Sequence, residues 1–195
     1  MNWLAHLRLA PDRPLLRIGN LAGDFVRGVD LATLHPELVR GVHQHRAIDA
    51  FVDAHPAVRA ARGLVPNPWS RFAGVLVDVY FDHFLAAAWD RLGDGGALPR
   101  FAAARYDELE VHAELLPPRL QRALPYLRAE DWLASYAELD GLAMILARMS
   151  RRSDKLAPLA EAWRPLADDP VRYAEAFAVL WPELTAYAAT AFAER

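Results

Sequence analysis

Apolar residues recur along most of the chain at intervals of three and four positions, and alternating runs of Val, Ile and Thr are almost absent. This spacing is typical of amphipathic α-helices rather than β-strands. The prolines fall mainly between the periodic segments, where they suit the first turns of helices. The pattern predicts an all-α fold, with helices near residues 17–28, 35–52, 56–63, 68–91, 98–114, 117–125, 130–148, 155–164 and 170–192.

The breaks between these segments look like turns, and no low-complexity linker or internal repeat interrupts the chain. The chain has 195 residues, of which 54% are hydrophobic, and this is enough for one substantial core. We therefore expect a single domain over residues 1–195, built as a helical bundle. The aromatic residues at helical spacing in the last third are expected to belong to its core.

The overall charge gives no reason to expect a nucleic acid or an anionic membrane as partner, because the formal net charge is -3. The first residues, MNWLAHLRLAPDRP, do not have the pattern of a signal peptide. Nowhere does an unbroken apolar run reach the ~18 residues that a membrane-spanning helix needs. We expect a cytoplasmic protein, and its oligomeric state is left open.

The chain has no cysteine, so any metal site must be built from His, Asp and Glu. Of the 22 basic residues only Lys155 is a lysine. Arginine is the better bidentate ligand for phosphate, but a GC-rich genome produces the same bias and is the preferred explanation.

The stretch VDVYFDHFL at residues 77–85 places three polar side chains inside an apolar helical run. At about 100° per residue, Asp78 and Asp82 lie only about 40° apart and share a face. Buried charges need compensation, and a purely structural explanation requires several buried partners at once. Asp78, Asp82 and His83 are therefore candidates for function, although His83 is turned about 100° from Asp82 and could instead support a ligand.

The stretch GVHQHRAIDAFVDAHP repeats this pattern, because His45 and Asp49 are four residues apart and share a helix face. His43 lies roughly opposite His45, so His45 is the better candidate. A surface ion pair between His45 and Asp49 explains the spacing equally well.

Two further candidates stand nearer the start of the chain. Asp24 in IGNLAGDFVRGVD follows two glycines that would let the backbone approach closely, and His6 lies in the apolar segment NWLAHLRLA. Asp24 could instead cap a helix, and a lone histidine on an apolar face is more often a core residue with satisfied hydrogen bonds.

Taken together, His and Asp side chains from several helices fit a divalent ion such as Mn²⁺ or Mg²⁺, with Fe²⁺ or Zn²⁺ as alternatives. Such an ion polarises a phosphoryl oxygen and lowers the pKa of a bound water. Arg46 and Arg27 could hold phosphate oxygens, or form structural ion pairs with the carboxylates. The chemistry indicated is metal-assisted hydrolysis of a phosphoester.

Five segments together resemble the acyl carrier protein phosphodiesterase family. They cover most of the chain in order, and a set of long motifs is far more specific than any one of them. They are NWLAHLRLA at 2–10, GNLAGDFVRG at 19–28, GVHQHRAIDAFVDAHP at 41–56, VDVYFDHFLAAAW at 77–89 and MSRRSDKLAPLAEAW at 149–163.

The resemblance implies an α-helical, HD-domain-like protein, distantly related to the HD-type metal phosphohydrolases. It implies a Mn²⁺-dependent enzyme that removes 4′-phosphopantetheine from holo acyl carrier protein and leaves the apo form with a free serine. Seven residues fall on the polar motif positions of the family and are its implied metal ligands: Asp24, His45, Asp49, Asp78, Asp82, His83 and, in the N-terminal motif, His6.

One departure concerns the dipeptide after which the HD-type enzymes are named. Here the adjacent pair is Asp82-His83, in reversed order, and no His-Asp dipeptide occurs. The ligand roles of that superfamily are therefore not transferred to this chain residue by residue.

The mechanism predicted on this basis is in-line attack of an activated water on phosphorus, which expels the serine oxygen of the carrier. Asp24, Arg46 and His83 are the predicted catalytic residues. Arg46 would stabilise charge on the phosphoryl group, and Arg27 and Arg151 or Arg152 are weaker candidates for this role. Acyl carrier proteins are acidic, so docking needs a local basic surface. The densest basic cluster is Arg148, Arg151 and Arg152, although such a run is usually a solvated turn.

Two other functions remain open from the sequence. A metal phosphohydrolase acting on a nucleotide or another small phosphodiester would use the same site. A non-catalytic helical protein that binds acyl carrier protein would need no metal, and it would keep its function when Asp24 or Asp78 is replaced.

Overall fold

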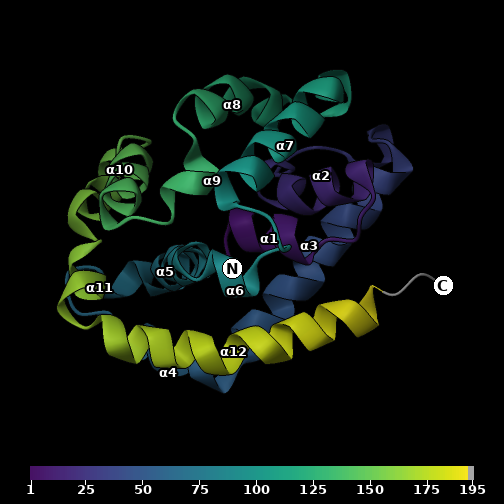
Figure 1. Cartoon of the computed structure of the whole chain (residues 1–195). Helices are drawn as coiled ribbons and strands as arrows, with labels where there is room; N and C mark the ends of the chain where they lie inside the picture. Colours follow the sequence, from purple (N-terminus) through teal and green to yellow (C-terminus); the bar gives the residue numbers. More distant parts are fainter. Residues whose placement is uncertain (193–195) are drawn as a thin grey trace.

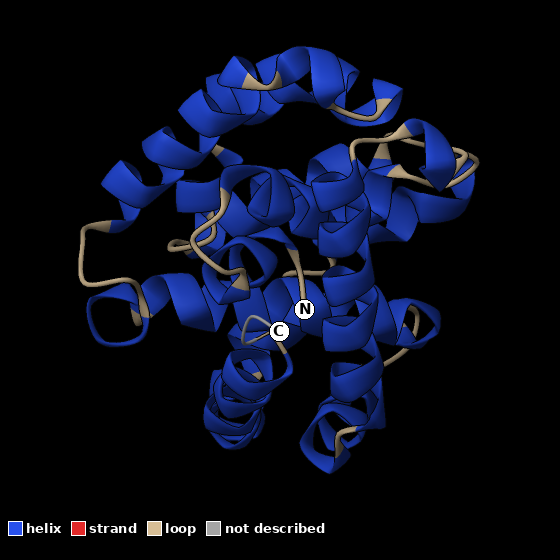
Figure 2. Cartoon of the chain, turned by 90° about the vertical axis from the view of Figure 1, so that its right-hand side faces the viewer, coloured by secondary structure: helices blue, strands red, loops and turns tan. Residues whose placement is uncertain are grey.

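The computed structural model describes residues 1–192, and in this range the chain forms helices and connecting loops without strands (Figures 1 and 2). The predicted all-α class is confirmed. The α-helices are α1 (Trp3–Leu9), α2 (Pro14–Ala22), α3 (Pro36–Ala54), α4 (Pro56–Leu64), α5 (Ala73–Ala87), α6 (Trp89–Leu92), α7 (Leu98–Val111), α8 (Pro118–Ala129), α9 (Trp132–Ser135), α10 (Leu139–Ser150), α11 (Arg164–Asp168) and α12 (Pro170–Ala191). Short 3₁₀ helices are η1 (Gly23–Phe25), η2 (Leu31–Thr33), η3 (Ser70–Phe72), η4 (Ala113–Leu115) and η5 (Asp154–Glu161).

The predicted boundaries agree with the structure where proline marks the start of a helix. Pro36, Pro56 and Pro170 each occupy the first turn, and α3, α4 and α12 begin within a residue of their predicted starts. His55 caps α4, because its Nδ1 accepts a hydrogen bond from the amide of Ala57. Proline and a capping side chain are therefore reliable start signals in this chain.

Several predictions of helices are wrong. The predicted helix 68–91 is divided among η3, α5 and α6, and most of the predicted helix 155–164 is the 3₁₀ helix η5. The sequence prediction has no helix before residue 17, yet residues 3–9 form α1; every residue of α1 except Arg8 is buried, so the helix shows no polar face in the sequence. The predicted helix 130–148 is divided into α9 and α10. A Cβ at Gly141 would lie 2.0 Å from the carbonyl oxygen of Ser135, so the glycine lets α10 fold back closely on α9.

The buried side chains from Met1 to Ala188 form one hydrophobic cluster. In Figure 1, α1 lies in the middle of the molecule, α12 crosses its base together with α4, and α8 and α10 lie at the top. The short helix α1 contacts α2, α5 and α12, so it is enclosed by helices from distant parts of the sequence. Its side chains are therefore held firmly.

Helices α2 and α3 pack with their backbones in contact. A Cβ on Gly19 would lie 2.2 Å from the carbonyl oxygen of Leu38, and one on Gly41 would lie 2.2 Å from that of Leu16. No larger residue fits at either position without moving a helix. This close packing brings the end of α2 against the middle of α3.

Within residues 1–192, no helix has the length and apolar character needed to cross a membrane.

Candidate active site

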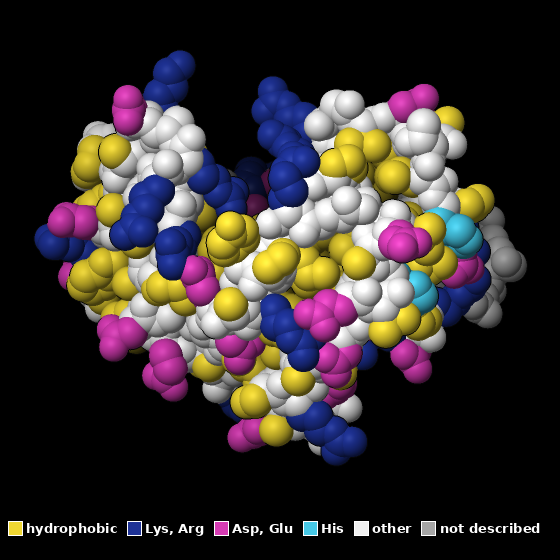
Figure 3. Space-filling view, turned by 90° about the horizontal axis from the view of Figure 1, so that it is seen from above, with side chains coloured by type: hydrophobic (Ala, Val, Ile, Leu, Met, Phe, Trp, Pro, Cys, Tyr) yellow, Lys and Arg dark blue, Asp and Glu magenta, His cyan; other side chains and the backbone are white. Residues whose placement is uncertain are grey.

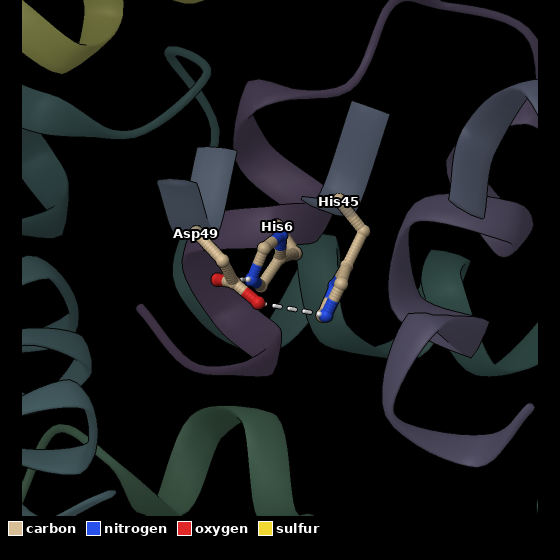
Figure 4. Close-up of side chains that lie close together, drawn as sticks. All are labelled: His6, His45 and Asp49. Carbon is tan, nitrogen blue, oxygen red and sulfur yellow. Dashed lines mark ion pairs between the residues drawn. The ribbon is translucent and has the colours of Figure 1, made fainter. Parts of the chain in front are cut away.

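His6 from α1 comes together with His45 and Asp49 from α3 (Figure 4). The two histidines are buried, and the Asp49 side chain is 39% exposed. His45 Nε2 lies 3.0 Å from Asp49 Oδ2, and His6 Nε2 lies 3.2 Å from Asp49 Oδ1. One ligand atom from each of the three lies within 4.8 Å of the others. In the described part of the chain, this is the group of acidic and histidine side chains that is close enough to hold an ion.

Asn20 fixes the orientation of both imidazole rings. His45 Nδ1 lies 2.9 Å from the Asn20 backbone carbonyl, and His6 Nδ1 lies 2.9 Å from the Asn20 side-chain oxygen. Since a carbonyl oxygen can only accept, each Nδ1 donates its hydrogen, and in the neutral rings each Nε2 carries a lone pair. Both lone pairs are directed to the side of Asp49.

The end of α2 leaves space for the ring of His45. A Cβ on Gly23 would lie 2.2 Å from Cγ and Cδ2 of His45, so the ring rests directly on the glycine. The rings of His6 and His45 are stacked, with their centroids 4.0 Å apart. Gly23, which directly precedes Asp24, therefore allows the ring of His45 to lie against the backbone, as the sequence suggested.

Burial and charge set the protonation of this group. Burial is the largest cause that lowers the pKa of His6. Burial also opposes the charged form of His45, but its hydrogen bond with Asp49 and the nearby carboxylates outweigh burial and raise the pKa of His45. Although burial opposes ionisation of Asp49 too, the two neighbouring histidines, chiefly His45 through its hydrogen bond, hold the pKa of Asp49 far below its usual range. Asp49 is therefore ionised and the Nε2 atom of His6 carries no proton.

These three residues fit a divalent metal ion. Two imidazole nitrogens and a carboxylate, with no sulfur, are the donors that suit Mn²⁺, Fe²⁺ and Zn²⁺. Adjacent ligands of an octahedral ion with bonds near 2.1 Å are about 3 Å apart, close to the distances from each Nε2 to Asp49. His6 Nε2 is fully buried and makes no hydrogen bond, which is costly unless another partner binds it.

Asp24 connects this group with a cleft. Its Oδ1 lies 3.6 Å from His45 Nε2, and its Oδ2 accepts a 2.8 Å hydrogen bond from the indole nitrogen of Trp3. The side chain is 48% exposed, so the carboxylate can meet a ligand from solvent. Asp24 therefore lies beside the group of His6, His45 and Asp49, called the His/Asp group below, and also lines the cleft.

The cleft has a volume of about 540 Å³. It lies between α8 and the end of α10, and Figure 3 shows Lys and Arg side chains gathered on both sides of a hollow in this face. Phe25, Trp3 and Trp132 form a row of rings in its lining, with neighbouring centroids 5.4 Å and 5.2 Å apart. Three exposed arginines also line it: Arg119, Arg122 and Arg152.

The two aspartates of VDVYFDHFL have partners at the start of the chain. Asp78 Oδ1 lies 3.0 Å from the amino group of Met1, which also lies 3.9 Å from Asp49. Asp82 is fully buried and accepts hydrogen bonds from the amides of Asn2 and Leu4, at 3.2 Å and 2.7 Å. Burial raises the pKa of Asp82 to about 7, against the opposing effect of these hydrogen bonds and of the amino group. The structure thus gives Asp82 a capping role at α1, outside the His/Asp group.

The other predicted residues lie at varying distances from the site. His83 Nδ1 lies 2.8 Å from the carbonyl of Tyr136 and does not join the His/Asp group. Arg46 and Arg27 are exposed and do not line the cleft. Their predicted roles, and those of Asp78 and Asp82 as ligands, stay predictions.

The predicted basic cluster divides into three different environments. Arg152 lines the cleft, whereas Arg151 is exposed and does not. Arg148 forms an ion pair with Glu130 and lines a smaller adjoining cavity of about 210 Å³.

Sequence reasoning missed Arg119 and Arg122, which stand three residues apart on α8. A signal was present in the sequence, because α8 carries three arginines and no acidic residue. An exposed helix normally mixes both signs of charge, so a helix with one sign is a candidate for binding an anion.

Comparison with known proteins identifies the relatives of this chain. The model of the family described as acyl carrier protein phosphodiesterase matches residues 1–184. The chain belongs to this family. Among the curated members, the acyl carrier protein phosphodiesterase of Yersinia enterocolitica is 37% identical over 188 residues, covering 96% of this chain and 97% of the relative. That of Serratia proteamaculans is 40% identical over 160 residues, covering 82% and 83%, respectively. No solved structure matches the chain.

Membership in the acyl carrier protein phosphodiesterase family confirms the resemblance that the five motifs indicated, and with it the prediction of an enzyme of this kind. The relatives are matched along nearly their whole length, so the His/Asp group and the cleft both lie within the matched part. The HD-type topology is compatible with the helical fold and stays a prediction.

Proposed function

We propose that this chain is a metal-dependent phosphodiesterase that hydrolyses holo acyl carrier protein to the apo form and 4′-phosphopantetheine. The observation that carries the proposal is the pair of buried histidines whose Nε2 atoms are directed to Asp49, beside an arginine-lined cleft. The name of the relatives, acyl carrier protein phosphodiesterase, indicates the substrate class. A structural ion pair alone would not leave His6 Nε2 buried without a hydrogen bond.

His6, His45 and Asp49 are the residues that would hold the ion, and Asp24 is the nearest further carboxylate. We propose Mn²⁺, with Mg²⁺ or Fe²⁺ as alternatives. When bound, such an ion would polarise a phosphoryl oxygen and lower the pKa of a water. Asn20 would keep both rings in the required orientation, because its two oxygens accept the Nδ1 hydrogens.

The reaction forms a bond between the water oxygen and phosphorus and breaks the bond between phosphorus and the serine oxygen of the carrier. Asp24 is placed to take the proton of the attacking water, since it is exposed to the cleft and held by Trp3. Arg152 would balance the charge on the phosphoryl oxygens. Catalytic roles for Arg46 and His83 remain proposals without a contact in the site.

The test is incubation of the purified chain and Mn²⁺ with holo acyl carrier protein, or with a panel of nucleotides and small phosphodiesters. Mass spectrometry of the carrier would report loss of the phosphopantetheine group. We expect apo carrier protein from the wild type and none from Asp49→Asn, with the exposed His43→Ala as matched control. Turnover of a nucleotide without formation of apo carrier would contradict the proposal.

A further inference from the structure

We propose that the cleft between α8 and α10 binds the pantetheine arm of the substrate, with the phosphate end beside Asp24 and Arg152. This inference rests on the proposed function, because it takes the phosphopantetheine group from it. Beyond the proposed function, the inference specifies where the pantetheine arm lies and which residues bind it.

The charge of the cleft indicates an anionic ligand. Among residues 1–192, the guanidinium groups of Arg119, Arg122 and Arg152 make no hydrogen bond and no ion pair, whereas Arg148, Arg128 and Arg17 all have carboxylate partners. Among the described residues that line the cleft, Asp24 is the only acidic one, and its Oδ2 already accepts a hydrogen bond from Trp3. Unpaired arginines around a concave surface are a common arrangement for binding phosphate.

The volume of the cleft favours a small, elongated ligand. Sites for small molecules usually have volumes of about 300–1,000 Å³, and this cleft has about 540 Å³. A flat protein surface would instead need a much larger contact area. The pantetheine arm is a narrow chain with amide groups and a branched apolar segment, which could pack on the row of rings from Phe25 through Trp3 to Trp132.

The position of the cleft places such a ligand at the reacting atoms. Asp24 lines the cleft and lies 3.6 Å from His45, so a phosphate at this end of the cleft reaches the His/Asp group. Arg152 follows α10 and lines the same cleft as Asp24. Arg119 and Arg122 stand on α8 and are left to contact the remainder of the arm.

The experiment measures binding of 4′-phosphopantetheine to the full chain in the presence of Mn²⁺ by isothermal titration calorimetry. This probe is the proposed product and undergoes no further hydrolysis. We expect Arg122→Ala and Arg152→Ala each to weaken binding about tenfold or more, as expected for loss of a charge-assisted hydrogen bond. Pantetheine, which lacks the phosphate, should also bind at least about tenfold more weakly.

The matched control is Arg100→Ala. Arg100 is an exposed arginine of α7 that makes no ion pair with another described residue and does not line the cleft. It should bind 4′-phosphopantetheine as the wild type does. Unchanged binding in Arg122→Ala and Arg152→Ala would overturn the inference. The inference would also be overturned if these two variants bound apo carrier protein more weakly but bound 4′-phosphopantetheine as the wild type does. That result would assign the arginines to contacts with the acidic surface of the carrier.

The two proposals can fail separately. Hydrolysis of holo carrier protein by a wild type that does not bind 4′-phosphopantetheine would overturn the cleft assignment and leave the proposed function standing. Arginine-dependent binding of 4′-phosphopantetheine without hydrolysis of holo carrier protein would support the cleft as a binding site and contradict the proposed function.

Discussion

Asp82 accepts a 2.7 Å hydrogen bond from the amide of Leu4, so a carboxylate buried in α5 caps the first turn of α1. The first amides of a helix lack partners within the helix, and the carboxyl oxygens of Asp82 supply partners for them. Because α1 also carries His6, this contact holds one member of the His/Asp group in place.

The first prediction concerns the pH dependence of folding stability. The pKa of Asp82 is raised from an ordinary value near 4 to about 7. Between these two values the folded chain holds a proton that the unfolded chain has lost, so this group makes stability fall as pH rises from 4 to 7 and adds no further change above 7. Asp82→Asn removes the effect. Wild type and variant are compared by subtracting the unfolding free energy of the variant from that of the wild type. This difference should be larger at pH 5 than at pH 8, by up to about 3 kcal/mol.

Urea denaturation at the two pH values measures this difference, and the other titrating groups are common to both proteins. An equal difference at pH 5 and pH 8 would show that Asp82 is ionised throughout.

The second prediction concerns metal binding. Loss of a residue that only supports a metal ligand typically lowers metal affinity about 10–100-fold. We expect a larger loss of Mn²⁺ affinity when a ligand itself is replaced, in His45→Ala, His6→Ala and Asp49→Asn. Equilibrium dialysis against Mn²⁺ would measure it. His43→Ala is the control, because His43 is an exposed residue on the opposite side of α3. Equal affinities in the wild type and Asp49→Asn would exclude this group as the metal site.

The third prediction concerns Asn20. Its side-chain oxygen accepts from His6, while its backbone carbonyl accepts from His45. Asn20→Ala therefore frees the ring of His6 and leaves the partner of His45 intact. We expect about a 10–100-fold loss of Mn²⁺ affinity with the helical content retained, measured by dialysis and circular dichroism. Unchanged affinity would mean that packing alone orients the ring.

The fourth prediction concerns Gly23. A Cβ there would lie 2.2 Å from the ring of His45, so Gly23→Ala must displace the ring or α2. Overpacking of this kind costs typically about 1–3 kcal/mol, and Mn²⁺ affinity should fall as well. Gly63→Ala in α4 is the matched control, since a Cβ at Gly63 would meet nothing within 4 Å. This substitution should stabilise the helix slightly. Thermal unfolding and Mn²⁺ titration of both variants test this; wild-type behaviour of Gly23→Ala would contradict the role of the glycine.

The sequence predicted much of the fold because helix starts depend on local chemistry. Pro36, Pro56 and Pro170 mark helix starts without reference to the rest of the chain. Helix α1 escaped prediction because it is buried on nearly all sides, and periodicity reports only helices with one polar face.

Part of the candidate site could be predicted because it depends on residues close together in the sequence. His45 and Asp49 share a face of one helix, and the four-residue spacing revealed this. The partners of Asp82 could not be predicted, because they lie 78 and 80 residues away in sequence and depend on how α1 packs against α5. The sequence indicated that the buried polar side chains of VDVYFDHFL need partners. For Asp82, the partners are the amides of Asn2 and Leu4 at the start of α1.

The most direct test of the central claim is hydrolysis of holo acyl carrier protein as a function of Mn²⁺ concentration, for the wild type and for Asp49→Asn. Both proteins would first be stripped with a chelator. The claim predicts that apo carrier formation by the wild type is absent without metal and saturates as Mn²⁺ is added, while Asp49→Asn stays inactive. Apo carrier formation by the stripped wild type, or a wild-type response in Asp49→Asn, would contradict it.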